Sequence, residues 1–304
     1  MKAQNLFFGF ALMATFSLAG CSNNSSNNTT ENDFDIPDSL INAPLQLSEN
    51  AVNDMIENIS SPVEMANEIK NSGAEFQENI LNPSDKIKDY NTSFKRALNL
   101  GAYSADLGYI NTFNKSSVVV SYLMAVKDLA DGINVGQFLD FNTLKRLATN
   151  RSNLDSLKQL SVTSFNNMDK YLREQKRSNV SSAIVAGAWI EGIYITSRVI
   201  EQTNNQNLIN RLGEQKDIVK ILLIILDNYS KADKNFKDLA EKIENISKVY
   251  DNVRITVEMG EPVAVEKDGM LAWESNEKTH VEITDEQVKD IIKNIKEARE
   301  FMVE

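Results

Sequence analysis

Two carboxylates stand out in this sequence because each is the only charged residue of a long stretch. Asp106 is the only charge within 97–111, and Glu191 is the only charge within 180–197. A helix that is apolar or small on all sides is buried, and a buried carboxylate without a partner has a raised pKa. Two such acids can act as general acid and base, as in glycosidases, whose carboxyl groups lie about 5–9.5 Å apart. Asp106 and Glu191 are therefore the catalytic candidates.

A structural role for the same two acids is the alternative. Asp106 can accept hydrogen bonds from Tyr or Ser groups of a neighbouring helix, and Glu191 can pair with Arg198 or with Arg96. The surroundings discriminate between the two roles, because an enzyme needs both carboxylates in a pocket that solvent reaches. The candidate ligand-binding residues are Arg198 and the aromatic residues of the two stretches, although aromatics at helical spacing usually belong to a core: Tyr103, Tyr109, Trp189 and Tyr194.

The composition excludes much of the usual catalytic and metal chemistry. The chain contains one cysteine and one histidine, His280, so Ser-His-Asp and Cys-His catalysis lack their base. The same scarcity excludes multi-Cys zinc and iron–sulfur sites and the HExxH motif, and neither GxGxxG nor GxxxxGK[ST] occurs. A net charge of −11 is unfavourable for binding phosphate backbones. We expect no metal, no cofactor and no nucleic-acid partner, and we expect His280 to be exposed.

The cysteine, Cys21, follows a stretch with the features of a secretory signal. Lys2 supplies a positive charge, and the apolar run 6–18 is too short to span a membrane. The tetrapeptide 18–21, Leu-Ala-Gly-Cys, resembles a bacterial lipobox. That resemblance implies cleavage between Gly20 and Cys21, with lipid attached to the Cys21 thiol. Each buried CH₂ contributes about 0.8 kcal/mol, so several acyl chains, such as palmitate, anchor a protein durably.

A polar tether is predicted after the lipid-attachment site. Residues 22–30 are all Ser, Asn or Thr and cannot build a core. The sequence therefore predicts a signal peptide at 1–20, a lipid-anchored flexible tether at 21–45 and a single helical domain at 46–304. Ser22, rather than an aspartate, follows the cysteine, which resembles the sorting signal of outer-membrane lipoproteins in Gram-negative bacteria. We expect a protein of the bacterial cell envelope, lipid-anchored in the outer membrane and facing the periplasm.

Helical periodicity dominates the proposed domain and predicts a mainly α fold, either an antiparallel helical bundle or an array of helical hairpins. Three signals indicate early helices: an apolar stripe at 52–59, a capping box at Ser61 and the motif 82–85. The helix that begins at Ser61 is expected to end at Gly73. The longer helices are expected at 92–113, 117–130, 152–172, 178–201 and 207–229. A further apolar stripe at 236–249 indicates another helix, and the last helix begins in a capping box at Thr284.

Two segments need separate interpretation. Residues 253–273 alternate in polarity and contain Asp-Gly, which predicts a short β-hairpin between the last two helices. Helix 178–201 reaches the length of a membrane span. The Glu191 charge and the hydroxyl side chains of this helix instead favour a central core helix. The close spacing of Gly187 and Gly192 is typical of close helix–helix approach.

The motifs 101–109, Gly-Ala-Tyr-Ser-Ala-Asp-Leu-Gly-Tyr, and 186–194, Ala-Gly-Ala-Trp-Ile-Glu-Gly-Ile-Tyr, suggest a family. They resemble recurring motifs of uncharacterised all-helical lipoproteins of Bacteroidetes-type bacteria. This resemblance implies a fold and a location but no activity. The leading hypothesis is a lipid-anchored helical module that binds an envelope protein or a small ligand. The alternatives are a hydrolase or lyase that uses Asp106 and Glu191, and a SusD-like glycan-binding lipoprotein, for which the chain is short.

Overall fold

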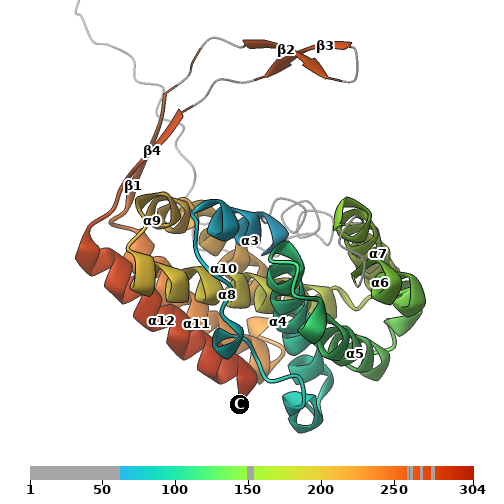
Figure 1. Ribbon diagram of the computed structural model, residues 1–304. Coiled ribbons are helices and arrows are strands. Elements are labelled where there is room, and N and C mark those ends of the chain that lie inside the picture. The colour runs from blue at the N-terminus through green and yellow to red at the C-terminus, as the bar shows by residue number, and fades with distance from the viewer. Residues whose placement is uncertain (1–61, 149–153, 259, 261–262, 268–269, 275–277) are drawn as a thin grey trace, which may run out of the picture. The chain divides into compact units, whose positions relative to one another are not determined.

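The computed structural model describes residues 62–148, 154–258, 260, 263–267, 270–274 and 278–304. The signal segment with Cys21, the tether, the stripe at 52–59 and Ser61 lie outside these residues. The mainly α prediction is confirmed within them (Figure 1). The helices are α3 Pro62–Asn71, α4 Ser93–Thr112, α5 Ser116–Gly132, α6 Phe141–Ala148, α7 Leu154–Glu174, α8 Ser178–Thr203, α9 Gln206–Gly213, α10 Lys216–Ser230, α11 Lys234–Tyr250 and α12 Asp285–Val303, with 3₁₀ turns η1 Glu78–Ile80, η2 Lys86–Asp89 and η3 Gly136–Phe138.

Helix α8 runs through the middle of the helical domain (Figure 1). Its neighbours include α3, α4, α7 and α12, and its most extensive contact is with α4. Among the described helices it is the one long and apolar enough to cross a membrane, but 78% of its most apolar window is buried inside the domain. Burial of this kind is typical of a core helix, and it agrees with the interpretation of the sequence.

Two glycines allow α4 and α8 to pack backbone against backbone. A Cβ atom added to Gly187 would lie 1.8 Å from the Leu98 carbonyl oxygen, and one added to Gly101 would lie 1.9 Å from the Ile184 carbonyl oxygen. Only a residue without a side chain fits at either position. The close-approach interpretation of Gly187 is therefore confirmed, and it explains how two helices bring their polar residues near each other.

Side-chain caps mark helix starts where the sequence indicates them. The Thr92 hydroxyl accepts a hydrogen bond from the Lys95 backbone N–H at the start of α4. At the start of α12, Thr284 and Gln287 form both hydrogen bonds of the predicted capping box. Gly73 follows α3 with a φ of +80°, a left-handed conformation that favours glycine and ends the helix.

Two predicted helices are wrong in detail. The helix expected at 207–229 is divided into α9 and α10 by a break at 214–215, directly after Gly213. Gly213 lies against Val281 at this break, and a Cβ atom there would be 2.3 Å from the valine side chain. The start expected at 82–85 leads only to the short 3₁₀ turn η2. Helix formation fails there because side chains of other helices bind the backbone carbonyls of Asn82 and Pro83.

The predicted β excursion between α11 and α12 is confirmed but is longer and more divided than a single hairpin. Strand β1, Arg254–Glu258, pairs antiparallel with β4, Lys278–Glu282, and β2, Val263–Lys267, pairs antiparallel with β3, Met270–Glu274 (Figure 1). The β1–β4 register places Arg254 opposite Glu282 and Glu258 opposite Lys278, so opposite charges face each other at both ends. His280 is exposed in β4, as expected, and its Nε2 lies 3.4 Å from Glu258 Oε2.

Candidate functional site

The structure brings the two candidate acids, Asp106 of α4 and Glu191 of α8, into one buried cluster. Both residues are 0% exposed. Burial raises the pKa of Asp106 well above its usual value, and the neighbouring Glu191 charge raises this pKa further. The sequence therefore identified two residues that the fold brings together, although they are far apart in the chain.

Glu191 is paired with Arg299 of α12. Arg299 Nε donates to Glu191 Oε2 at 3.2 Å, and Arg299 Nη2 donates to Glu191 Oε1 at 3.3 Å. This forked geometry suits a guanidinium facing a carboxylate. The guanidinium also lies over the Tyr194 ring, with Cζ 4.4 Å from the ring centroid. The Arg299 guanidinium thus forms an ion pair with Glu191 and a cation–π contact with Tyr194 at the same time.

The partners expected for Glu191 were wrong. Arg198 pairs instead with Glu201, one turn further along α8. Arg96 donates to the backbone carbonyls of Tyr90 at 2.8 Å and Gly132 at 3.2 Å. The true partner, Arg299, was missed because α12 carries many charges, and nothing in its spacing distinguishes the one that faces the core.

Asn82 completes the cluster and was also missed. We call residues 81–90 the strap, because this segment without α-helix lies against the acids. The Asn82 backbone N–H and side-chain amide each donate to Asp106 Oδ2 at 3.3 Å. Arg299 Nη2 donates to Asn82 Oδ1 at 2.6 Å. The strap is therefore bound to both acids, directly to Asp106 and through Arg299 to Glu191.

Two tyrosines also bind the strap. The Tyr122 hydroxyl of α5 donates to the Asn82 carbonyl at 2.6 Å, and the Tyr103 hydroxyl of α4 donates to the Pro83 carbonyl at 2.7 Å. A third ring, Tyr90 of the strap, packs edge-on against Tyr103 with centroids 6.4 Å apart. Burial raises the pKa of all three tyrosines, and that of Tyr90 reaches about 12. All three hydroxyls are therefore neutral at physiological pH, and those of Tyr103 and Tyr122 donate hydrogen bonds, whereas the Tyr90 hydroxyl has no partner.

Arg299 and Glu191 perturb each other in opposite senses. Burial raises the pKa of Glu191, and the Arg299 charge and its hydrogen bonds oppose that rise. Burial lowers the pKa of Arg299, but the Glu191 carboxylate outweighs this effect and raises it above its ordinary value. The pair is therefore ionic, and each charge depends on the other for its stability in the core.

The candidate aromatic residues do not share one cavity. Tyr103 and Tyr194 belong to the acid cluster. Trp189 is buried beside the α9–α10 break, where its Nε1 donates to Gln215 Oε1 at 3.1 Å. The Tyr109 hydroxyl accepts from the Gln77 backbone N–H at 3.1 Å, and its ring stacks on Phe76 with centroids 5.3 Å apart. Each ring contacts protein partners of its own, as is usual for aromatics in a core.

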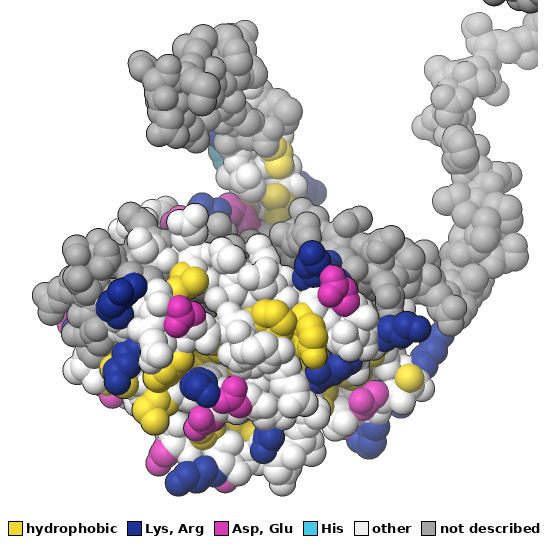
Figure 2. Space-filling view, turned by 90° about the vertical axis from the view of Figure 1, so that its right-hand side faces the viewer, with side chains coloured by type: hydrophobic (Ala, Val, Ile, Leu, Met, Phe, Trp, Pro, Cys, Tyr) yellow, Lys and Arg dark blue, Asp and Glu magenta, His cyan; other side chains and the backbone are white. Residues whose placement is uncertain are grey.

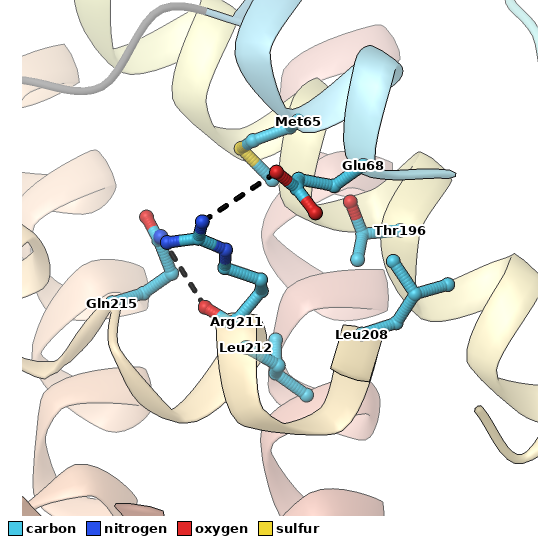
Figure 3. Close-up of a pocket in the computed structure, with 7 residues that line it drawn as sticks. All are labelled: Met65, Glu68, Thr196, Leu208, Arg211, Leu212 and Gln215. Atoms are coloured by element: carbon cyan, nitrogen blue, oxygen red, sulfur yellow. Dashed lines mark hydrogen bonds and ion pairs between the residues drawn. The ribbon is translucent and has the colours of Figure 1, made fainter. Parts of the chain in front are cut away.

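A separate hollow lies between α3, α8 and α9 (Figure 3). Its volume is about 230 Å³. Arg211 lies at its rim, where Nη2 is 3.5 Å from Glu68 Oε1 and Nη1 is 2.7 Å from Glu214 Oε2. The remaining lining is mainly apolar and includes Met65, Leu208 and Leu212. This hollow contains none of the candidate site residues.

The acid cluster can hold charge and protons, but in this structure it cannot touch a substrate, because neither acid has exposed surface. Within the part of the chain that the structure describes, no group of three or more His, Cys, Asp or Glu residues could hold a metal ion. Comparisons with protein-family models, with curated proteins and with solved structures found no match.

Proposed function

We propose that this chain is a lipid-anchored protein of the bacterial cell envelope that acts as a helical binding module and not as an enzyme. The observation that carries the proposal is the tetrapeptide 18–21, Leu-Ala-Gly-Cys, at the end of an apolar signal and with the only cysteine of the chain. A lone thiol at this point is well suited to lipid attachment, because several acyl chains on one residue anchor a protein durably. The anchor lies at the outer membrane, with the domain in the periplasm.

The burial of the acids argues against catalysis by these two carboxylates. Asp106 and Glu191 are held by Asn82 and Arg299, and each is 0% exposed. General acid and base groups must reach the substrate within hydrogen-bonding distance. The carboxylate-dependent hydrolase or lyase therefore receives no support from this geometry.

A protein partner suits this domain better than a small ligand. The hollow of about 230 Å³ at Arg211 is smaller than the roughly 300–1,000 Å³ of ordinary ligand sites. Figure 2 shows that acidic and basic side chains are interspersed on the face it presents, with apolar side chains between them. We therefore infer an envelope protein as the partner.

The anchor is tested at Cys21. Cells supplied with a palmitate analogue should label the wild-type protein and the Ser22→Ala variant, whereas Cys21→Ala should remain unlabelled because it lacks the thiol that forms the bond. When residues 1–20 are replaced by a cleavable signal without a lipobox, Cys21→Ala should move to the soluble periplasmic fraction. Labelling of Cys21→Ala, or failure of the wild-type protein to label, would contradict the anchor.

A further inference from the structure

The hydrogen bonds of the acid cluster leave one carboxylate oxygen without a donor. Both oxygens of Glu191 accept from Arg299, and Asp106 Oδ2 accepts twice from Asn82. Asp106 Oδ1 is buried and has no partner. The nearby Tyr103 and Tyr122 hydroxyls cannot supply the missing bond, because each donates its proton to a strap carbonyl. The Tyr90 hydroxyl is also buried, but it forms no hydrogen bond with Asp106 Oδ1.

The charges of the cluster are also unbalanced when both acids are ionised. Asp106 and Glu191 would carry two negative charges, and Arg299 supplies one positive charge. An uncompensated charge in a core is strongly unfavourable, and two neighbouring carboxylates commonly bind one proton between them. One proton on Asp106 Oδ1 would therefore give this oxygen a hydrogen bond to donate and would also neutralise the excess negative charge.

We propose that Asp106 and Glu191 together hold one proton at neutral pH, on Asp106 Oδ1, and that this proton locks the strap, residues 81–90, onto α4, α8 and α12. The proton allows Asp106 to donate to Glu191 and makes the cluster of two acids and Arg299 electrically neutral. Glu191 remains the ionised partner of Arg299. Asp106 Oδ2 still accepts from Asn82, so the same neutral acid joins the strap to the helices.

The electrostatics of the surrounding elements agree with this arrangement. Burial and the Glu191 charge raise the pKa of Asp106. Burial also raises the pKa of Glu191, and the Arg299 charge and a hydrogen bond from Asp106 oppose that rise. Burial is the main cause of the raised pKa of Tyr122 and of Tyr90. The exposed acid Glu78 of η1 raises the pKa of Tyr122 further, and the exposed acid Asp89 of η2 raises that of Tyr90 further. The titratable and charged groups around the pair are Tyr90 and Asp89 of the strap, Glu78 of η1, Tyr103 of α4, Tyr122 of α5, Tyr194 of α8 and Arg299 of α12.

The bound proton sets the direction of the pH dependence. The pKa of Asp106 is higher in the folded than in the unfolded chain, so the folded state binds the extra proton once the pH exceeds about 4, the unfolded value. The stabilisation that this proton gives is complete below that pH and is lost as the pH rises through the folded pKa. In this window the unfolding equilibrium constant rises about tenfold per pH unit relative to a protein without the titration.

Asp106→Asn is the matched mimic, because its amide donates where the protonated acid would. Unfolding of the full chain in urea can be followed by tryptophan fluorescence from pH 5 to pH 9. The ratio of the wild-type to the Asp106→Asn unfolding constant should rise about tenfold per pH unit until the proton is released. The control Asp290→Asn changes an exposed acid of α12, so its ratio to wild type should remain constant. A wild-type to Asp106→Asn ratio that does not change with pH would overturn the proposal.

Infrared spectroscopy tests the folded protein without relying on the stability of a variant. The wild-type protein at pH 7 should show the carbonyl band of one protonated carboxyl group, and this band should shift in D₂O. Glu191→Gln removes one of the two negative charges, so the Arg299 charge alone balances an ionised Asp106 and the band should disappear. A wild-type spectrum without the band would show that no proton is held.

The lock is tested by hydrogen exchange of the strap. The hydrogen-exchange rate of peptides that cover 81–90 is measured in the wild-type and Asp106→Asn proteins at each pH. The ratio of the wild-type rate to the variant rate should rise once the proton is released, while the same ratio for peptides of α10 stays constant. In the contrary outcome, the infrared band is present at pH 7 and disappears at higher pH without any rise in the exchange rate of the strap. That result would show that the pair binds a proton but that the proton does not lock the strap.

Discussion

Gly187→Ala should destabilise the domain by about 3 kcal/mol or more, even though alanine is the better helix former. The added Cβ atom would lie 1.8 Å from the Leu98 carbonyl oxygen, which is backbone and cannot rotate away. Helices α4 and α8 would have to separate along the most extensive contact of the fold. Urea unfolding monitored by circular dichroism would measure the loss, and Gly101→Ala should behave in the same way from the other side of the contact.

Gly132→Ala is the control for this prediction. Its Cβ atom would meet the Arg96 side chain, with Nη1 at 2.5 Å, and a side chain can move where a backbone carbonyl cannot. We therefore expect a smaller loss for Gly132→Ala than for Gly187→Ala. Helix propensity alone predicts that Gly187→Ala gains up to about 1 kcal/mol. A Gly187→Ala protein as stable as wild type would contradict the close packing of α4 and α8.

Arg299→Met should cost about 3–5 kcal/mol, because it leaves Glu191 charged in the core without a partner. It also removes the donor to Asn82 Oδ1, so the strap loses a hydrogen bond. The stability lost should be smaller at acid pH, where Glu191 becomes protonated and no longer needs a cation. Denaturant unfolding of the wild-type and Arg299→Met proteins at pH 5 and pH 8 measures both the loss and its direction with pH.

Two variants control for the loss of an arginine and for the loss of the pair. Arg198→Met removes the half-exposed partner of Glu201 and should cost less than about 1 kcal/mol. The double variant Arg299→Met with Glu191→Gln removes the stranded charge and should recover part of the stability lost in Arg299→Met. If Arg299→Met costs no more than Arg198→Met, the buried pair does not hold the fold together.

The sequence by itself determined the local features of this protein. Apolar spacing predicted α4, α5, α7, α8 and α12, and the capping boxes predicted where α12 starts, because these signals act between residues only a few positions apart. Isolated charges in apolar stretches predicted the burial of Asp106 and Glu191. The lipid anchor at Cys21 is also predicted from a local motif, and it stays a prediction with its own test.

Only the tertiary structure decided which distant groups meet. Arg299 pairs with Glu191 across 108 positions of the chain, and Asn82 binds Asp106 across 24 positions, whereas spacing along the chain favoured Arg198 for Glu191. The α9–α10 break and the missing helix at 82–85 have the same origin, because contacts with Val281, Tyr103 and Tyr122 outweigh local helix signals. Hydrophobic spacing shows that a residue faces inward, but the packing of α4 against α8 and α12 sets what it faces there.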